Sequence, residues 1–275
     1  MRIIAFGAHP DDCDSKVGGT AALWVRQGHV VKFVSVTNGD AGHHEIGGVE
    51  LARRRRAEAA AAGKVIGVTY QVLDIHDGEL EPSLPNRRRI IEIIREFQPD
   101  LVLSPRPNDY HPDHRYTAVL VQDAAYMVTV PNIAAHTPHL RDNPCICYVS
   151  DHFQRPYPFT PDVVVGIDDV ISLKFDMMHC HVSQYYEWLP YNGRNEQNVP
   201  ADDAERRRWL ESRRAGGGKD IANRFREKLI ERYGPVRGAA IQYAEAFEAC
   251  EYGARLTPDR LQALFPAIET ANAAG

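Results

Sequence analysis

Two short stretches of the chain combine histidine with aspartate at spacings that suit a metal ion. The first, AHPDDCD at residues 8–14, places one imidazole and three carboxylates directly after an apolar run. Carboxylates this close repel one another unless a positive charge lies among them. The second, SPRPNDYHPDH at residues 104–114, follows another apolar run and ends in HPDH. Together the two stretches could hold a divalent cation.

The chemistry that these residue types allow is metal-assisted hydrolysis. Two imidazoles, one carboxylate and an open fourth position form the ligand set of many hydrolytic zinc sites. The chain offers His9 and Asp12 in the first stretch, and His111 and His114 in the second. A zinc ion polarises a water and stabilises the oxyanion that forms when this water attacks a carbonyl. The water also needs a general base, and Asp11 is placed for that role.

The two stretches must be brought together by the elements that precede them. Short apolar runs that resemble buried strands alternate four times with helical patterns. This alternation predicts a Rossmann-like α/β fold, a mainly parallel sheet with helices on both faces. The expected strands cover residues 2–8, 29–36, 68–75 and 99–105, and the expected helices cover 17–28, 49–67, 86–97 and 114–128.

Ligands of such sheets bind beyond the carboxyl ends of the strands, so the four strand exits are compared. All are rich in His and Asp: AHPDDCD, TNGDAGHHE, DIHDGEL and SPRPNDYHPDH. One exit alone is better explained as a helix cap or a turn, but two such exits of one sheet favour a metal site.

HPDD also stands where a dinucleotide fold carries GxGxxG. Its carboxylates would repel phosphate, which argues against nicotinamide or flavin binding.

The rest of the chain predicts an α/β extension of the same domain. Two further strands are expected at 145–151 and 162–168, followed by a helix at 168–188. We treat residues 1–275 as a single domain with a core of about residues 1–190. A polar stretch at 190–218 is an excursion that could be a lid, an interface or a disordered loop. The C-terminal extension, 219–275, should contain a helix at 219–234 and a short helix with Thr257 as N-cap.

The composition is that of an ordinary globular protein, with 275 residues, 44% hydrophobic and 25% charged. A net charge of −5 offers no electrostatic footprint for nucleic acid. No apolar stretch approaches a membrane span and no secretory signal is recognisable, which predicts a cytoplasmic protein without a membrane partner. The five cysteines are odd in number and scattered, so reduced thiols are expected.

Several motifs together resemble one family. AHPDD with the downstream GGT, TNGDAG, RRAE, HPDHR and the late HVSQ occur in the order found in PIG-L/LmbE-like zinc N-deacetylases. The resemblance covers roughly residues 2 to 190. It implies one zinc ion per chain, bound by His9, Asp12 and His114, with Asp11 as the general base. His111 matches a histidine that assists at the oxyanion or at the leaving group.

The resemblance also implies residues on the substrate side. Arg55 in RRAE matches an arginine that contacts the sugar or its neighbouring groups, and Asp109 could bind sugar hydroxyls. Asp40 of TNGDAG and His181 of HVSQ complete the set, and His181 is expected to support the wall of the site. The chain departs from the common HPDDE motif, because a cysteine follows HPDD and the acid comes one residue later, at Asp14.

The function expected from the resemblance is removal of an acetyl group from an N-acetylated amino sugar or glycoconjugate of the N-acetylglucosamine type, releasing acetate and a free amine. An alternative is a zinc amidase that acts on thiol conjugates or another small amide. A non-catalytic sugar-binding α/β protein is disfavoured, because neither the base nor any zinc ligand is lost. The family resemblance also predicts a homo-oligomer, a trimer or a hexamer.

Overall fold

The computed structural model describes residues 1–265 and contains one seven-stranded sheet, in the order β3-β2-β1-β4-β5-β7-β6. The first five strands are parallel, and β7 is antiparallel to both β5 and β6. This confirms the predicted mainly parallel α/β fold. The strands are β1 Arg2–Gly7, β2 Val30–Ser35, β3 Thr69–Val72, β4 Leu101–Ser104, β5 Cys145–Val149, β6 Val163–Gly166 and β7 Ala244–Ala249.

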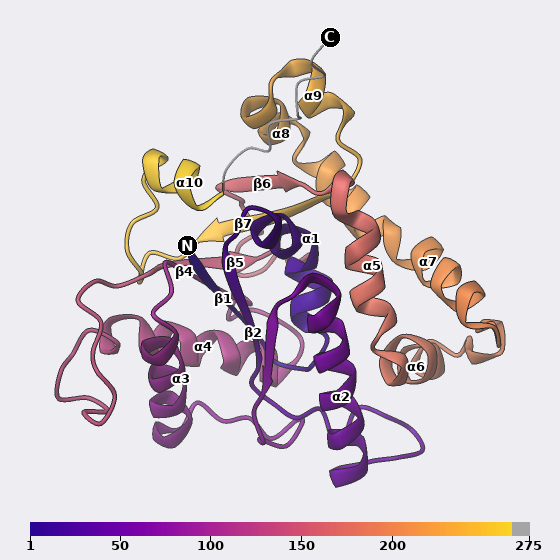
Figure 1. Cartoon of the computed structure of the whole chain (residues 1–275), viewed down its shortest axis with the longest axis horizontal. Helices are drawn as coiled ribbons and strands as arrows, with labels where there is room; N and C mark the ends of the chain where they lie inside the picture. The colour runs from indigo at the N-terminus through magenta and orange to yellow at the C-terminus, as the bar shows by residue number, and fades with distance from the viewer. Residues whose placement is uncertain (266–275) are drawn as a thin grey trace.

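Helices cover both faces of the sheet. Figure 1 shows α3 and α4 on one side of the strands and α1, α2 and α5 on the other. Alternate residues of β1 accordingly enter different hydrophobic clusters, with Ile3 on the side of α1 and Ile4 on the side of α3. The α-helices are α1 Asp12–Arg26, α2 Gly48–Ile66, α3 Leu84–Phe97, α4 Pro112–Met127, α5 Ile171–His179, α6 Leu189–Asn192, α7 Asp203–Arg224, α8 Arg226–Tyr233, α9 Pro235–Ala240 and α10 Pro258–Leu264.

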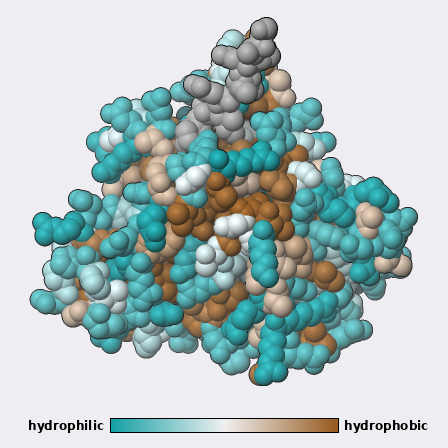
Figure 2. Space-filling view, viewed as in Figure 1, coloured by the Kyte–Doolittle hydropathy of each residue, from teal (hydrophilic) through white to brown (hydrophobic). Residues whose placement is uncertain are grey.

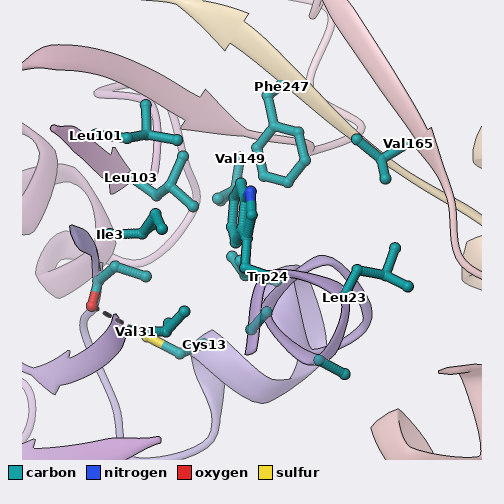
Figure 3. Close-up of a cluster of buried hydrophobic side chains, with 14 of the residues drawn as sticks. Ile3, Cys13, Leu23, Trp24, Val31, Leu101, Leu103, Val149, Val165 and Phe247 are labelled. Atoms are coloured by element: carbon teal, nitrogen blue, oxygen red, sulfur yellow. Dashed lines mark hydrogen bonds between the residues drawn. The ribbon is translucent and has the colours of Figure 1, made fainter. Parts of the chain in front are cut away.

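A buried tryptophan fastens the C-terminal part of the chain to the core. Trp24 of α1 packs against Phe247 of β7, with ring centroids 6.3 Å apart (Figure 3). Its indole N–H donates to the carbonyl of Leu264, at 2.9 Å, at the end of α10. The cap predicted for α10 is confirmed, since the hydroxyl of Thr257 accepts from the backbone N–H of Arg260. The extension thus shares the core of the sheet.

The surface, the cysteines and the helices each give a simpler result. Hydrophilic residues cover the outer parts of the face seen in Figure 2, and hydrophobic residues gather near its centre. All five cysteines are free, as the sequence predicted. Among residues 1–265, no helix combines the length and the apolar character needed to cross a bilayer.

The structure differs from the sequence-based predictions in several places. The helix expected over 219–234 is divided between the end of α7 and α8. β7 was not predicted, because its sequence AEAFEA is poor in β-branched residues and only its neighbours make it a strand. The helix expected over 168–188 is divided into a 3₁₀ turn, α5 and a π-helical turn at Ser183–Trp188. The polar stretch at 190–218 is largely helical, since α7 begins at Asp203 and continues through three glycines, each costing about 1 kcal/mol relative to alanine.

Replacing Arg95 by methionine should lower the free energy of unfolding by about 2–4 kcal/mol. Arg95 is 2% exposed, and its guanidinium donates to the carbonyls of Met127, Val128, Val130, Ile133, Ala134 and Thr137. Methionine fills the volume but leaves these carbonyls without their donor. Denaturant unfolding measures the difference. Arg89→Met is the control on the same helix, and an equal loss in both variants would contradict the assigned role.

Candidate metal centre and active site

Three side chains from two strand exits meet at the carboxyl edge of the sheet. His9 Nδ1 lies 3.2 Å from His114 Nε2, and Asp12 Oδ2 lies 3.6 Å from the first and 3.5 Å from the second. Zinc bonds of 2.0–2.1 Å in tetrahedral geometry would separate two ligand atoms by about 3.3 Å. The triangle therefore has the size that one zinc ion requires.

Local structure explains why these atoms converge. β1 and β4 are neighbouring parallel strands, so the turns that follow them leave the same edge of the sheet. After β1, Asp12 opens α1, and its Oδ2 accepts the backbone N–H groups of Ala8, at 2.9 Å, and His9, at 2.8 Å. After β4, His111 is the N-cap of α4 and places His114 in the first helical turn.

The outward-facing nitrogen of each triangle histidine contacts a carboxylate. His9 Nε2 lies 3.1 Å from Asp77 Oδ1 and 3.4 Å from Asp113 Oδ2, and His114 Nδ1 lies 3.0 Å from Asp109 Oδ1. Carboxylates in this position orient metal-binding histidines and leave the opposite nitrogen free for the ion. The donor set therefore fits a divalent metal.

The carboxylates around the cluster stabilise positive charge at its centre. Burial by itself raises the pKa of Asp12, but His114 and His9 outweigh burial and hold this pKa far below its usual range. Burial lowers the pKa of His9, and Asp113, Asp12 and Asp77 outweigh it, so the pKa is raised. The Asp12 carboxylate is thus ionised and faces two imidazoles.

Other combinations of side chains could also hold an ion here. Ligand atoms of His9, His111 and His114 lie within 4.8 Å of one another, and the same holds for His9, Asp77, His111 and Asp113. His9 belongs to every set. In the set predicted from the sequence, the three ligand atoms lie 3.2 to 3.6 Å apart, close to the separation expected around one zinc ion, and we prefer it for that reason.

The predicted base lies beside the triangle and is held by the predicted arginine. Asp11 Oδ1 accepts from Arg55 Nη2 at 2.7 Å, and Arg55 Nη1 donates to the carbonyl of Gly39 at 3.0 Å. Arg55 is 2% exposed, so its contact with Asp11 is sheltered from water. Gly39 has φ of 70°, and a Cβ there would collide with the Arg55 guanidinium. Among residues 1–265, the other Asp11 oxygen makes no hydrogen bond.

These groups open into a cavity of about 720 Å³, a size common for small-molecule sites. One part of its wall comes from the strand exits, and the other comes from α5, the π-helical turn and α7. The lining includes His9, Asp11, Asp12, Lys16, Arg55, Asp77, Tyr110, His111, His114, Lys174, Gln184, Tyr185, Trp188, Arg214, Gly217 and Glu245. Segments far apart in the sequence therefore build one site.

Of the four residues predicted on the substrate side, only Arg55 is part of this lining. Asp40 accepts from His76 Nδ1, at 2.6 Å, and from a backbone N–H, which orders its loop. Asp109 lies behind the ring of His114. His181 is fully buried, and its Nε2 lies 2.8 Å from Asp14. All three lie outside the lining, so their roles in binding substrate stay predictions.

Several lining residues were not singled out from the sequence. Asp77 stands in DIHDGEL, one of the four polar exits, so its place after a strand was the available signal. Lys174 and Glu245 form an ion pair at 2.7 Å between α5 and β7, which are distant in the chain. No short motif contains both residues, so sequence patterns offered no sign of this pair.

The fold and the cluster define a class: an α/β protein with a candidate site for a metal-activated water at the carboxyl edge of its sheet. A family model described as "PIG-L: GlcNAc-PI de-N-acetylase" matches residues 4–125. A diacetylchitobiose deacetylase of Thermococcus kodakarensis is 32% identical over 207 residues, or 69% of this chain and 74% of the relative. The chain belongs to the PIG-L family, which confirms the resemblance.

Two further comparisons define the range of the likeness. An N,N'-diacetylchitobiose deacetylase structure from Pyrococcus horikoshii superposes with a TM-score of 0.68 at 26% identity, over 91% of this chain and 84% of that one. A 4-oxalmesaconate hydratase of Pseudomonas putida is 24% identical over 196 residues, covering 68% of this chain and 76% of the relative. Both hydrolysis and hydration therefore occur among proteins that this chain resembles.

Proposed function

We propose that this protein is a zinc-dependent N-deacetylase. Its substrate is an N-acetylated amino sugar or glycoconjugate of the N-acetylglucosamine type, and its products are acetate and the free amine. The observation that supports this most directly is the triangle of His9, Asp12 and His114 with Asp11 beside it. The deacetylases of Thermococcus and Pyrococcus support the substrate class.

The zinc ion, when bound by His9, Asp12 and His114, would polarise the acetamide carbonyl and acidify the attacking water. Asp11 takes the proton of this water, since its carboxylate lines the cavity and one oxygen is free. Arg55 orients Asp11 by occupying the other oxygen. The departing amine receives the proton that Asp11 took from the water, which completes hydrolysis.

His111 is suited to stabilise the oxyanion. Its Nδ1 accepts from the backbone N–H of Asp113 at 3.2 Å, so a neutral ring carries its proton on Nε2. Burial lowers the pKa of His111, and the neighbouring His9 and His114 lower it further, which favours the neutral ring. An Nε2–H group in the cavity lining can donate to an oxygen that gains negative charge.

A second candidate keeps the site and changes the bond that is attacked. The similarity to 4-oxalmesaconate hydratase favours testing addition of water to a carbon–carbon double bond. The amidase acting on thiol conjugates remains an alternative of the same chemistry as deacetylation.

We also propose that the chain acts in the cytoplasm as a homo-oligomer and that residues 1–275 form one domain.

The test combines metal analysis with product detection. Purified protein should contain about one zinc per chain and release a fluorescamine-reactive amine from N-acetylglucosamine or diacetylchitobiose. A thiol conjugate and an unsaturated carboxylic acid are assayed in parallel. Zinc with turnover of only one of these last two substrates would replace the deacetylase assignment by amidase or hydratase. A protein that binds no divalent metal would refute the proposal.

A further inference from the structure

Outside the His and Asp cluster, the cavity lining contains three further cationic side chains, Lys16, Lys174 and Arg214. Lys174 is already neutralised, because its Nζ lies 2.7 Å from Glu245 Oε1. Glu245 is itself 1% exposed and accepts the backbone N–H groups of Gly19 and Thr20 at 3.0 and 2.7 Å. This pair is fully satisfied within the protein and has no need of a ligand.

Lys16 lacks such a partner. Its Nζ donates to the carbonyl of Ser150 at 3.0 Å, and within residues 1–265 no carboxylate oxygen lies within 4.0 Å of it. An ammonium group carries three donors, so two remain for a ligand. Burial lowers the pKa of Lys16 more than the nearby Asp12 carboxylate raises it, and a bound anion would oppose this effect of burial. Lys16 lies one helical turn after Asp12, on the same face of α1.

Arg214 is the second cation without a counter-charge. Its guanidinium lies over the ring of Tyr185, 5.2 Å from the centroid. The part of the chain that the structure describes provides no carboxylate within ion-pair distance of it. Tyr185 is 4% exposed, so the ring gives the guanidinium a fixed support at the cavity wall. A guanidinium held in this way can still present its N–H fork to a carboxylate or a phosphate.

Beside Arg214, helix α7 presents only small residues to the cavity. Ala215, Gly217 and Gly218 line the same cavity, and a Cβ at Gly217 would meet no atom within 4 Å. No neighbouring group of the protein therefore requires glycine at this position. The arrangement leaves room for a ligand close to the backbone of α7.

The placement of charge in the lining points to the sign of this ligand. Four cationic side chains (Lys16, Arg55, Lys174 and Arg214) and four carboxylates (Asp11, Asp12, Asp77 and Glu245) line the cavity. Asp109 and Asp113, which contact His114 and His9 from behind, add two carboxylates that a bound divalent metal would offset. The cations of the lining that have no carboxylate partner within residues 1–265 are Lys16 and Arg214, and an anionic substrate would supply one.

We propose that Lys16 and Arg214 form an anion-binding subsite, and that the substrate carries a carboxylate or phosphate group in addition to the amide that is cleaved. The inference rests on the proposed deacetylase function and narrows its substrate class to acidic N-acetyl amino sugars. Lys16 and Arg214 act here as specificity residues and take no part in moving protons.

The test compares matched substrates and variants. Amine release is measured for three substrates. N-acetylglucosamine carries no added charge, its 6-phosphate carries a phosphate, and N-acetylmuramic acid carries a carboxylate. The wild type should have a lower KM for at least one of the charged substrates. Lys16→Met and Arg214→Met should raise that KM at least tenfold, with kcat within about twofold and the neutral substrate little affected. The preferred charged substrate identifies the anion.

A binding measurement separates failure of the subsite from failure of the proposed function. Calorimetry with the metal-loaded protein follows binding of the 6-phosphate and of N-acetylmuramic acid, whether or not they are hydrolysed. Arg213→Met is the control, because Arg213 neighbours Arg214 but packs on Trp209 instead of lining the cavity. Weaker binding in Lys16→Met and Arg214→Met alone supports the subsite. Equal binding of both anions in all four proteins, or no preference of the wild type for either anion over the neutral sugar, overturns it.

Discussion

Asp11→Asn should lower kcat by about 10³-fold while the protein keeps its full metal content. Asparagine has the same shape and can still accept a hydrogen bond from Arg55, but its amide cannot take a proton from water. Asp11 is not one of the three triangle groups, so the ion should remain bound. Single-turnover amine release and elemental analysis of the same preparation measure the two effects together.

The control for this variant is Asp74→Asn, because the Asp74 side chain is 82% exposed and lies outside the cavity lining. It should keep wild-type activity. Arg55→Met is the complementary variant, since it removes the group that holds Asp11 and should reduce kcat by a smaller factor. An Asp11→Asn protein with full zinc and undiminished kcat would show that another group activates the water.

The meeting of His9, Asp12 and His114 could be predicted because their positions follow from chain order and strand direction. AHPDD and HPDH each come directly after a strand, and parallel neighbouring strands deliver their exits to one edge. The distances among His9, Asp12 and His114 then follow from two helix starts, Asp12 at α1 and the first turn of α4. Local sequence therefore contained most of the information needed for this part of the site.

The remaining cavity wall depends on contacts between distant segments. Glu245 is buried because Lys174 and two backbone N–H groups of α1 satisfy it, and no local pattern shows which partners a carboxylate will find. The same limit applies to Arg55. Its position in RRAE marked it as important, but only the structure shows that its guanidinium contacts Asp11 and the Gly39 carbonyl.

Strand β7 and helix α7 illustrate the opposite case, in which local preference is overridden. AEAFEA has little intrinsic tendency to form a strand, and the glycines of α7 disfavour a helix. Pairing with β5 and β6 stabilises strand β7. Helix α7 is stabilised through Leu210, which is 1% exposed and packs in a hydrophobic cluster with Phe175 and Tyr186.

His114→Ala should reduce bound zinc to less than about a tenth of the wild-type content, because two of three protein ligands hold the ion far more weakly than three. Asp109→Asn should weaken zinc binding by about 10 to 100-fold without removing a ligand, since Asp109 only orients the His114 ring. Competition with a chelator of known affinity measures both values. His136→Ala, at a side chain that is 70% exposed, should bind zinc as the wild type does.

The same experiment separates the preferred ligand set from the set without His114. If His9, Asp77, His111 and Asp113 held the ion, His114→Ala would retain zinc and Asp113→Asn would lose it. In the set that we prefer, Asp113 is not a ligand: it contacts the far nitrogen of His9 and accepts the backbone N–H groups of Gly78 and Leu80, so Asp113→Asn should weaken binding without abolishing it. Circular dichroism of each variant shows whether a lost ion reflects a lost ligand or a lost fold. Because zinc retained by a folded His114→Ala protein would exclude the preferred triangle, this variant tests the assignment on which the proposed reaction depends.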